Sequence, residues 1–110
     1  MWVMSDVSQR RQPGTVRATW RGVLLAESAD TMRVEGNDYF PPDAVRWEHL
    51  VESPTTSLCF WKGRARYLSV AVDDEVLPDA AWYYPRPWPL ARRIADRGAF
   101  WGGVQVERSP

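Results

Sequence analysis

The fold is decided by the stretch TSLCFWKGRARYLSVAVDD at residues 56–74. Two extended segments, 56–60 and 64–72, flank Lys62-Gly63, and the acidic pair Asp73-Asp74 closes the second segment. β-branched and aromatic residues are typical of strands, whereas Gly and Asp are typical of turns. The pattern predicts a β-hairpin followed by a further turn, and hence a chain of short antiparallel strands.

The segments upstream repeat this pattern of short runs separated by turns. Residues 16–20 alternate between apolar and polar side chains, and 23–26 and 31–35 follow after turns, which predicts a meander of three strands. Gly36-Asn37 is predicted to be a turn, because both residues tolerate positive φ. The other predicted elements are a helical turn at 43–45, strands at 46–51, 80–84 and 100–106, and a loop at 52–54.

One short helix is predicted near the C-terminal end. Pro89 suits the first helical position and Gly98 suits a C-terminal stop. The preceding run, 85–89, alternates prolines with other residues and is therefore not a central strand. We predict a mainly β fold: a small curved antiparallel assembly with one short C-terminal helix.

The length and composition allow a single domain. A chain of 110 residues with 45% hydrophobic content can bury one core. Seven Trp, four Tyr and three Phe supply large rings, so few residues are needed to fill it. Residues 5–14 are polar and end in Pro-Gly, which predicts a flexible N-terminal arm at 1–14 before one globular domain at 15–110.

Charge and hydropathy exclude several classes of partner. The 14 basic residues balance 14 acidic ones, whereas nucleic-acid-binding proteins usually carry a basic excess, so no nucleic acid is expected as a partner. No segment is long and apolar enough to cross a bilayer, and the first residues lack the features of a signal peptide. We therefore expect a cytoplasmic protein without a membrane partner, and the oligomeric state stays open.

Metal ligands are scarce. Cys59 and His49 are the sole cysteine and histidine of the sequence. An internal disulfide is impossible, and a tetrahedral zinc site would need unusual carboxylate ligands. We expect no structural zinc and no cofactor.

Three segments in order resemble a known family: EGNDYFP at 35–41, CFWKG at 59–63 with Tyr67, and AWYYP at 81–85. As a set they resemble the family catalogued as domain of unknown function 427, over about residues 15–106. The resemblance implies the β-tent (Mss4-like) fold, shared with B-type methionine sulfoxide reductases and the cereblon ligand-binding domain. Relatives with that fold often hold zinc through paired CxxC motifs, for which one cysteine is not enough. The family is sometimes labelled nucleotidyltransferase. The sequence does not support that activity, because it contains no Gly-rich loop of the kind that binds phosphate groups.

The three segments also supply a candidate ligand site. A partly apolar cleft with a few polar anchors is the usual make-up of a small-molecule site. Glu35 and Lys62 could pair, so that Lys62 would stay protonated and anchor an anion, while Trp82 would form an apolar wall. A simpler explanation leaves Lys62 in solvent at the hairpin tip and pairs Glu35 with an arginine such as Arg33 or Arg46. The candidate ligand-binding residues implied by the resemblance are Glu35, Asn37, Tyr39, Cys59, Lys62, Trp82 and Tyr84.

Three functions remain open at this point. The first is a non-catalytic module that binds an unidentified small molecule in an aromatic-walled polar pocket. The second is a small enzyme that uses Cys59 or Lys62 as nucleophile or Glu35 as base, which requires a second titratable group within reach. The third is a protein-interaction domain that uses the ridge at 85–89. An unpaired cysteine is more often a small buried apolar residue than a nucleophile.

Overall fold

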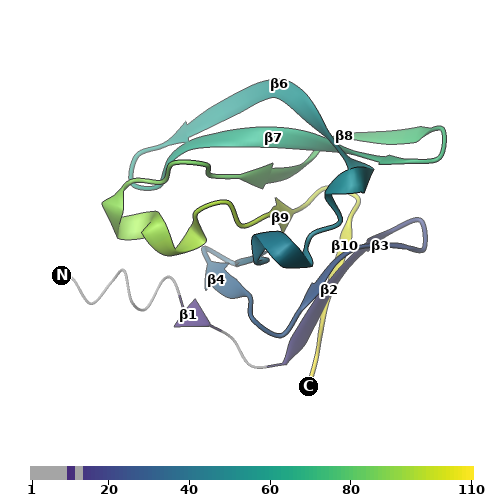
Figure 1. The fold of residues 1–110 in the computed structure, drawn as a ribbon, viewed down its shortest axis with the longest axis horizontal. Helices are drawn as coiled ribbons and strands as arrows, with labels where there is room; N and C mark the ends of the chain where they lie inside the picture. Colours follow the sequence, from purple (N-terminus) through teal and green to yellow (C-terminus); the bar gives the residue numbers. More distant parts are fainter. Residues whose placement is uncertain (1–9, 12–13) are drawn as a thin grey trace.

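The computed structural model describes residues 10–11 and 14–110 of the chain (Figure 1). Its elements, in chain order, are β1 (Arg10–Arg11), β2 (Thr15–Trp20), β3 (Val23–Ser28), β4 (Met32–Val34), β5 (Asn37–Tyr39), the 3₁₀ turns η1 (Pro42–Ala44) and η2 (Trp47–His49), β6 (Leu50–Cys59), β7 (Gly63–Val72), β8 (Glu75–Tyr83), the 3₁₀ helix η3 (Pro89–Ile94), β9 (Ala99–Phe100) and β10 (Gln105–Ser109).

The strands form three small sheets, with the orders β6-β7-β8-β9, β10-β2-β3 and β1-β4-β5. The first sheet crosses one side of the molecule, and β2, β3 and β10 run together on the other side (Figure 1). All pairings between these strands are antiparallel. The predicted mainly β, antiparallel fold is confirmed.

Strand β7 contributes to two separate hydrophobic clusters. Its buried side chains change phase between Ala65 and Leu68, so the strand does not keep one face inward along its whole length. The pairing of β7 with β8 is irregular between Leu68 and Val70, as expected where a bulge re-aims side chains. Beyond the phase change the strand packs into the main core, whose largest members include Val16, Leu25, Phe40, Val70 and Phe100. Before it, Ala65 belongs to a second cluster with Met32, Val34, Tyr39, Trp82, Tyr84, Ala91, Ile94 and Ala99.

The expected strand at 46–51 and loop at 52–54 are both wrong. Trp47–His49 forms η2, and the strand β6 begins only at Leu50 and continues without a loop to Cys59. Pro54 is tolerated because β6 is an edge strand and its pairing with β7 shifts register between Glu52 and Thr56. Pro54 and the polar residues around it therefore mark a bulge and not the end of the strand.

The predicted three-strand meander and the turn at Gly36-Asn37 are also wrong. β2 and β3 pair with each other, but the next strand, β4, pairs with β5 in a different sheet. The central turn residues are Glu35 and Gly36, both with positive φ, and Asn37 already pairs with Val34. A two-residue hairpin loop with positive φ at both positions is typical of a type I′ turn.

The C-terminal part differs from prediction in two respects. The expected helix is present but is the 3₁₀ helix η3, and it ends at Ile94, well before Gly98. Gly98 instead exchanges backbone hydrogen bonds of 2.8 and 3.1 Å with Phe40. The expected single strand at 100–106 is divided into β9 and β10, because Gly102 takes positive φ and turns the chain from β8 toward β2.

The predicted arm at 1–14 lies mostly outside the described residues. Of that segment, Arg10 and Arg11 form β1, which pairs with β4. None of the helices in the described part of the chain has the length and hydropathy of a membrane span.

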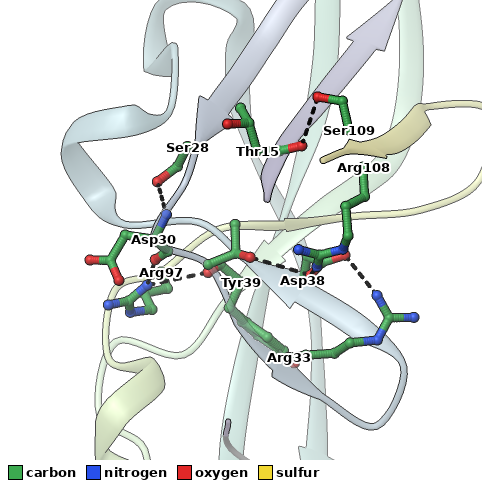
Figure 2. Close-up of polar contacts among 10 residues, drawn as sticks. Thr15, Ser28, Asp30, Arg33, Asp38, Tyr39, Arg97, Arg108 and Ser109 are labelled. Atoms are coloured by element: carbon green, nitrogen blue, oxygen red, sulfur yellow. Dashed lines mark hydrogen bonds and ion pairs between the residues drawn. The ribbon is translucent and has the colours of Figure 1, made fainter. Parts of the chain in front are cut away.

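A buried carboxylate ties the C-terminal strand to β5 (Figure 2). The Asp38 side chain, 6% exposed, accepts hydrogen bonds from Arg33 at 3.0 Å and from Arg108 of β10 at 2.5 Å. The hydroxyl of Thr31 donates to the same carboxylate at 3.4 Å. Because Tyr39 follows Asp38 directly, this contact fixes the strand that carries one of the candidate site residues.

Candidate functional site

The tip of the β6–β7 hairpin is covered on one side only, since Phe60 at the tip is 88% exposed whereas Lys62 is buried. Cys59 and Gly63 pair across the hairpin, which leaves a three-residue loop. The backbone N–H of Trp88 donates to the Lys62 carbonyl at 3.0 Å, and the chain leading into η3 lies beside the turn (Figure 1). Lys62 is only 5% exposed, so the expectation that this lysine stands in solvent is wrong.

The Lys62 ammonium is held by a carboxylate and two aromatic rings. Its Nζ atom donates to Glu35 Oε1, while the Trp61 indole N–H donates to Glu35 Oε2 at 3.2 Å. The same Nζ lies 5.1 Å from the centre of the Trp61 ring and 5.9 Å from that of Tyr84, within the range of cation–π contacts. Glu35 is thus the partner of Lys62, and neither of the expected arginines takes that role.

The charge of Glu35 is stabilised by this contact. The hydrogen bond from Lys62 is the largest influence and lowers the pKa of Glu35, although partial burial opposes it. Glu35 occupies the first positive-φ position of the β4–β5 turn, a backbone conformation that bulky residues rarely adopt. Arg21 has the same conformation in the β2–β3 turn, so the contact with Lys62 is what distinguishes Glu35.

The wall beside this ion pair is an aromatic cluster, which we define as Tyr39, Tyr67, Trp82 and Tyr84. The Tyr39 ring centre lies 6.2 Å from that of Trp82 and 6.4 Å from that of Tyr84. Tyr67 lies 6.3 Å from Trp82 on the other side. The separations are typical of edge-to-face and tilted aromatic pairs, which stabilise such clusters beyond their buried area.

Two buried tyrosines of the aromatic cluster have hydroxyl groups without an acceptor among the described residues. The Trp82 indole N–H donates to the Tyr39 oxygen at 3.1 Å, so that oxygen is an acceptor there and its own O–H is left over. Tyr84 is 5% exposed, and among residues 10–11 and 14–110 no side-chain hydrogen bond involves its hydroxyl. Burial raises the pKa of Tyr39 to about 12 and also raises that of Tyr84. Both groups are therefore protonated donors at neutral pH.

Cys59 lies at the edge of the aromatic cluster and is partly exposed. The backbone N–H groups of Trp61 and Lys62 and the Lys62 ammonium are the neighbouring groups that favour the thiolate form of Cys59. Partial burial acts to raise the pKa of the thiol, but the two backbone donors and the Lys62 charge outweigh it, and the pKa of Cys59 is lowered. This electropositive, accessible surrounding is typical of reactive cysteines.

Most of the candidate residues are brought together by these contacts. Glu35, Lys62, Cys59, Tyr39, Trp82 and Tyr84 form one connected group. Asn37 is apart: it pairs with Val34, and within the described residues no side-chain hydrogen bond involves it. The concavity expected around these residues stays a prediction.

Sequence reasoning left two participants out of the candidate set. Trp61 bonds Glu35 and lies under the Lys62 ammonium, and Tyr67 is one of the rings of the cluster. Both residues belong to one of the three segments that carry the family resemblance. Membership of that segment is the sequence feature from which they could have been included. The described residues include no group of three or more His, Cys, Asp or Glu side chains placed to hold a metal.

Comparison with known proteins agrees with the motifs. No curated protein matches the sequence. A family model with the description "Domain of unknown function (DUF427)" matches residues 8–109, nearly the whole chain. The order of the three aromatic-rich segments was therefore a sound guide to the family. The chain belongs to this family, the domain of unknown function DUF427.

Proposed function

We propose that this protein binds a small molecule whose oxygen acceptor, a carboxylate or a polarised carbonyl, is held by the hydroxyl groups of Tyr39 and Tyr84. The observation that carries the proposal is the pair of buried O–H groups without an acceptor in the described chain. The aromatic cluster forms the apolar wall of this site, and Lys62 adds a positive charge next to it.

The energetic argument concerns unsatisfied polar groups. A buried donor without a partner costs about 1–3 kcal/mol, and native structures rarely contain one without a reason. A ligand oxygen at this position would recover that free energy on binding. The positive charge of Lys62 favours an oxygen that is anionic or strongly polarised.

The alternatives have less support. Lys62 as nucleophile and Glu35 as base are both disfavoured, because each is occupied by the other in an ion pair. The ridge at 85–89 has an exposed Trp88, 43% exposed, as an interaction domain would need. The backbone N–H of Trp88, however, donates to the Lys62 carbonyl, so this segment covers the hairpin tip. That arrangement suits the wall of a binding site better than a free interaction surface. The antiparallel sheets are also compatible with the β-tent fold that the resemblance implies, and we include that fold in the proposal.

The test is a thermal-shift screen with three compound groups: carboxylates, neutral carbonyl compounds, and aromatic amines without oxygen. Compounds with an oxygen acceptor should raise Tm, because a ligand at about 100 times its Kd stabilises the folded state by about 2.7 kcal/mol. Oxygen-free amines should have no effect.

The matched variants are Tyr84→Phe and Tyr83→Phe, which remove the hydroxyls of two adjacent residues, the last residue of β8 and the one that follows it. Tyr84 is 5% exposed and its hydroxyl has no acceptor in the described part of the chain, whereas the Tyr83 hydroxyl donates to the exposed Glu52 at 3.4 Å. Tyr84→Phe should leave the unliganded protein at least as stable and should abolish the ligand-induced shift, and Tyr83→Phe should keep that shift. An undiminished shift in Tyr84→Phe would refute the proposed role of this hydroxyl.

A further inference from the structure

We propose that an exposed surface of the β6-β7-β8 sheet binds a neutral saccharide chain, with the Trp101 indole stacking on a pyranose ring and a row of polar side chains bonding its hydroxyl groups. This surface does not use the hydroxyls of Tyr39 and Tyr84, so the inference is independent of the function proposed above. It assigns a second binding site and a ligand class. The polar row is defined as Thr55, Ser57, Tyr67, Ser69 and Asp79.

Trp101 is exposed and yet held in one orientation. Its residue is 55% exposed. Its backbone N–H donates to the Ala80 carbonyl at 3.0 Å, and its indole N–H donates to the Asp79 carbonyl at 2.6 Å. The ring also makes an edge-to-face contact with Trp82, with ring centres 6.2 Å apart and planes at 87°. A ring that is fixed in this way loses little conformational freedom when a ligand stacks on it.

The polar row lies on the side of the sheet that Trp101 contacts. Trp82 stands opposite Tyr67 in the pairing of β8 with β7, and their ring centres are 6.3 Å apart. The Tyr67 hydroxyl lies 3.2 Å from that of Ser57 in β6. Ser69 points to the same face as Tyr67, because it is two residues further along β7. The row therefore starts beside the two indoles and crosses β7 to β6.

A bulge in β8 adds a carboxylate to this row. Residues 78–80 stand opposite the single residue Ser69, and Asp79 has a positive φ of 51°. The Asp79 N–H donates to the Ser69 hydroxyl at 3.2 Å, and its Oδ2 atom accepts from Thr55 at 2.8 Å. The Oδ1 atom of Asp79 has no bonding partner among the described residues. Bulges often re-aim a side chain beside a binding site, and this one presents an acceptor next to Trp101.

The hydrogen-bonding capacity of the row matches hydroxyl groups. Asp79 can only accept, whereas Ser69 accepts from the Asp79 N–H and keeps its own O–H to donate. Ser57 and Tyr67 share one hydrogen bond, which leaves the O–H of one of them. Sugar hydroxyls both donate and accept, so they use both kinds of group. A quaternary ammonium would leave the donors unused, and an anion would be repelled by the carboxylate.

The indole and the polar row suit different parts of one sugar. A pyranose with equatorial hydroxyls presents C–H bonds on its faces, and these contact the electron-rich face of an aromatic ring. Its hydroxyls project from the rim, where the polar row can bond them. A flat, exposed surface of this kind suits a chain of such rings better than a compact small molecule, which needs a cleft.

Trp47 provides a matched control on the opposite face. It is 37% exposed, and its indole N–H also donates to a backbone carbonyl, that of Pro42, at 2.8 Å. Its ring makes an edge-to-face contact with Tyr83 at 6.0 Å. Because Tyr83 and Trp82 are adjacent in β8, they point to opposite faces of the sheet. Trp47 therefore shares the exposure and the fixed indole of Trp101 without the polar row.

The probe is cellotriose, a neutral chain of three glucose rings, added to the full chain. Saturation-transfer NMR should show its ring C–H protons in contact with the protein, and titration followed by tryptophan fluorescence should give the Kd. Trp101→Ala should raise that Kd by about 10-fold through loss of stacking, and Trp47→Ala should leave it unchanged. Far-UV circular dichroism checks that each variant is folded. Absence of cellotriose binding, or equal losses in the two variants, would overturn the inference.

Asp79→Asn tests the polar row without touching the ring. Asn tolerates the positive φ of this position, so the bulge should persist. We expect the Kd for cellotriose to rise by about 5-fold, because a neutral acceptor forms a weaker hydrogen bond than a carboxylate does. Tetramethylammonium is the competing probe. Binding of this cation in place of cellotriose, or an unchanged cellotriose Kd in Asp79→Asn, would show that the surface is not a saccharide site.

Discussion

The small space around the charge at position 62 favours lysine over arginine. Lys62 is the one lysine among 14 basic residues. Its ammonium fits between the carboxylate of Glu35 and the rings of Trp61 and Tyr84. A guanidinium is larger and planar and needs several donor directions, so it is not equivalent to a compact ammonium in this position.

Replacement of Lys62 by arginine should therefore damage the site more than the fold. We expect Lys62→Arg to retain the far-UV circular dichroism of the native protein, to lower the free energy of unfolding by about 1–3 kcal/mol through overpacking, and to reduce the ligand-induced Tm shift. Arg64→Lys, an exposed change on the same hairpin, is the control. A full ligand-induced shift in Lys62→Arg would show that the compact charge is not required.

The contribution of the Glu35–Lys62 pair should depend on pH. The pKa of Glu35 is lower in the folded chain than its ordinary value of 4.5, chiefly through the hydrogen bond from Lys62. Such a group adds stability that is fully present above the unfolded pKa and is lost as the pH falls through the folded one. The difference in free energy of unfolding between wild type and Glu35→Gln should thus be constant near neutrality and vanish in strong acid.

Because the Glu35 side chain is 48% exposed, solvent weakens this pair. We expect the difference at neutral pH to be about 1 kcal/mol, and not the 3–5 kcal/mol of a fully buried pair. Urea titrations across the pH range provide the measurement. A difference that persists unchanged below the folded pKa would show that the loss comes from something other than the carboxylate charge.

Among the elements, two hairpin turns depend on glycine in different ways. Gly36 has a φ of 84° and a Cβ atom there would meet nothing within 4 Å, so only its backbone conformation excludes other residues. Gly63 has a φ of 104°, and a Cβ atom there would lie 3.4 Å from Trp88. The second turn is therefore limited both by its backbone and by the segment that covers it.

Alanine substitutions should separate these two effects. Gly36→Ala should cost about 1–2 kcal/mol of unfolding free energy, the price of one left-handed residue. Gly63→Ala should cost more, and should also increase the exposure of Trp88, which intrinsic fluorescence and its quenching by iodide can detect. Equal losses without a fluorescence change in Gly63→Ala would mean that the contact with Trp88 plays no part.

On the scale of the whole molecule, Asp38 joins parts of the chain that are far apart in sequence. Its carboxylate binds Arg33 in β4 and Arg108 in β10, 70 residues away (Figure 2). The C-terminal strand thereby holds both β2, through the sheet, and β5, through this carboxylate. Tyr39, the next residue, depends on the same contact for its position.

Asp38→Asn should remove that connection. Loss of one partner of a buried ion pair costs about 3–5 kcal/mol, but Arg108 is 28% exposed and Arg33 is 44% exposed, which reduces the expected loss to about 2 kcal/mol. Asp74→Asn, at an exposed turn, should be neutral. Urea unfolding of both variants measures the difference, and a loss in Asp38→Asn no larger than in Asp74→Asn would contradict the proposed connection.

The sequence by itself determined the local elements and the family. Alternation and turn residues predicted the β6–β7 hairpin and the strands β2 and β3, because side-chain periodicity and turn chemistry are local properties. They did not reveal that β6 passes through Pro54, since an edge strand can absorb a proline that a central strand cannot.

Only the tertiary structure decided how the site is assembled. Trp61 and Lys62 meet Glu35 across 26 and 27 residues, and Trp82 meets Tyr39 across 43. Such contacts depend on which strands pair and on the change of phase in β7, and neither has a periodic signature in the chain. The backbone of Lys62 is likewise held by the hydrogen bond from the Trp88 N–H, a contact between segments that no local pattern connects.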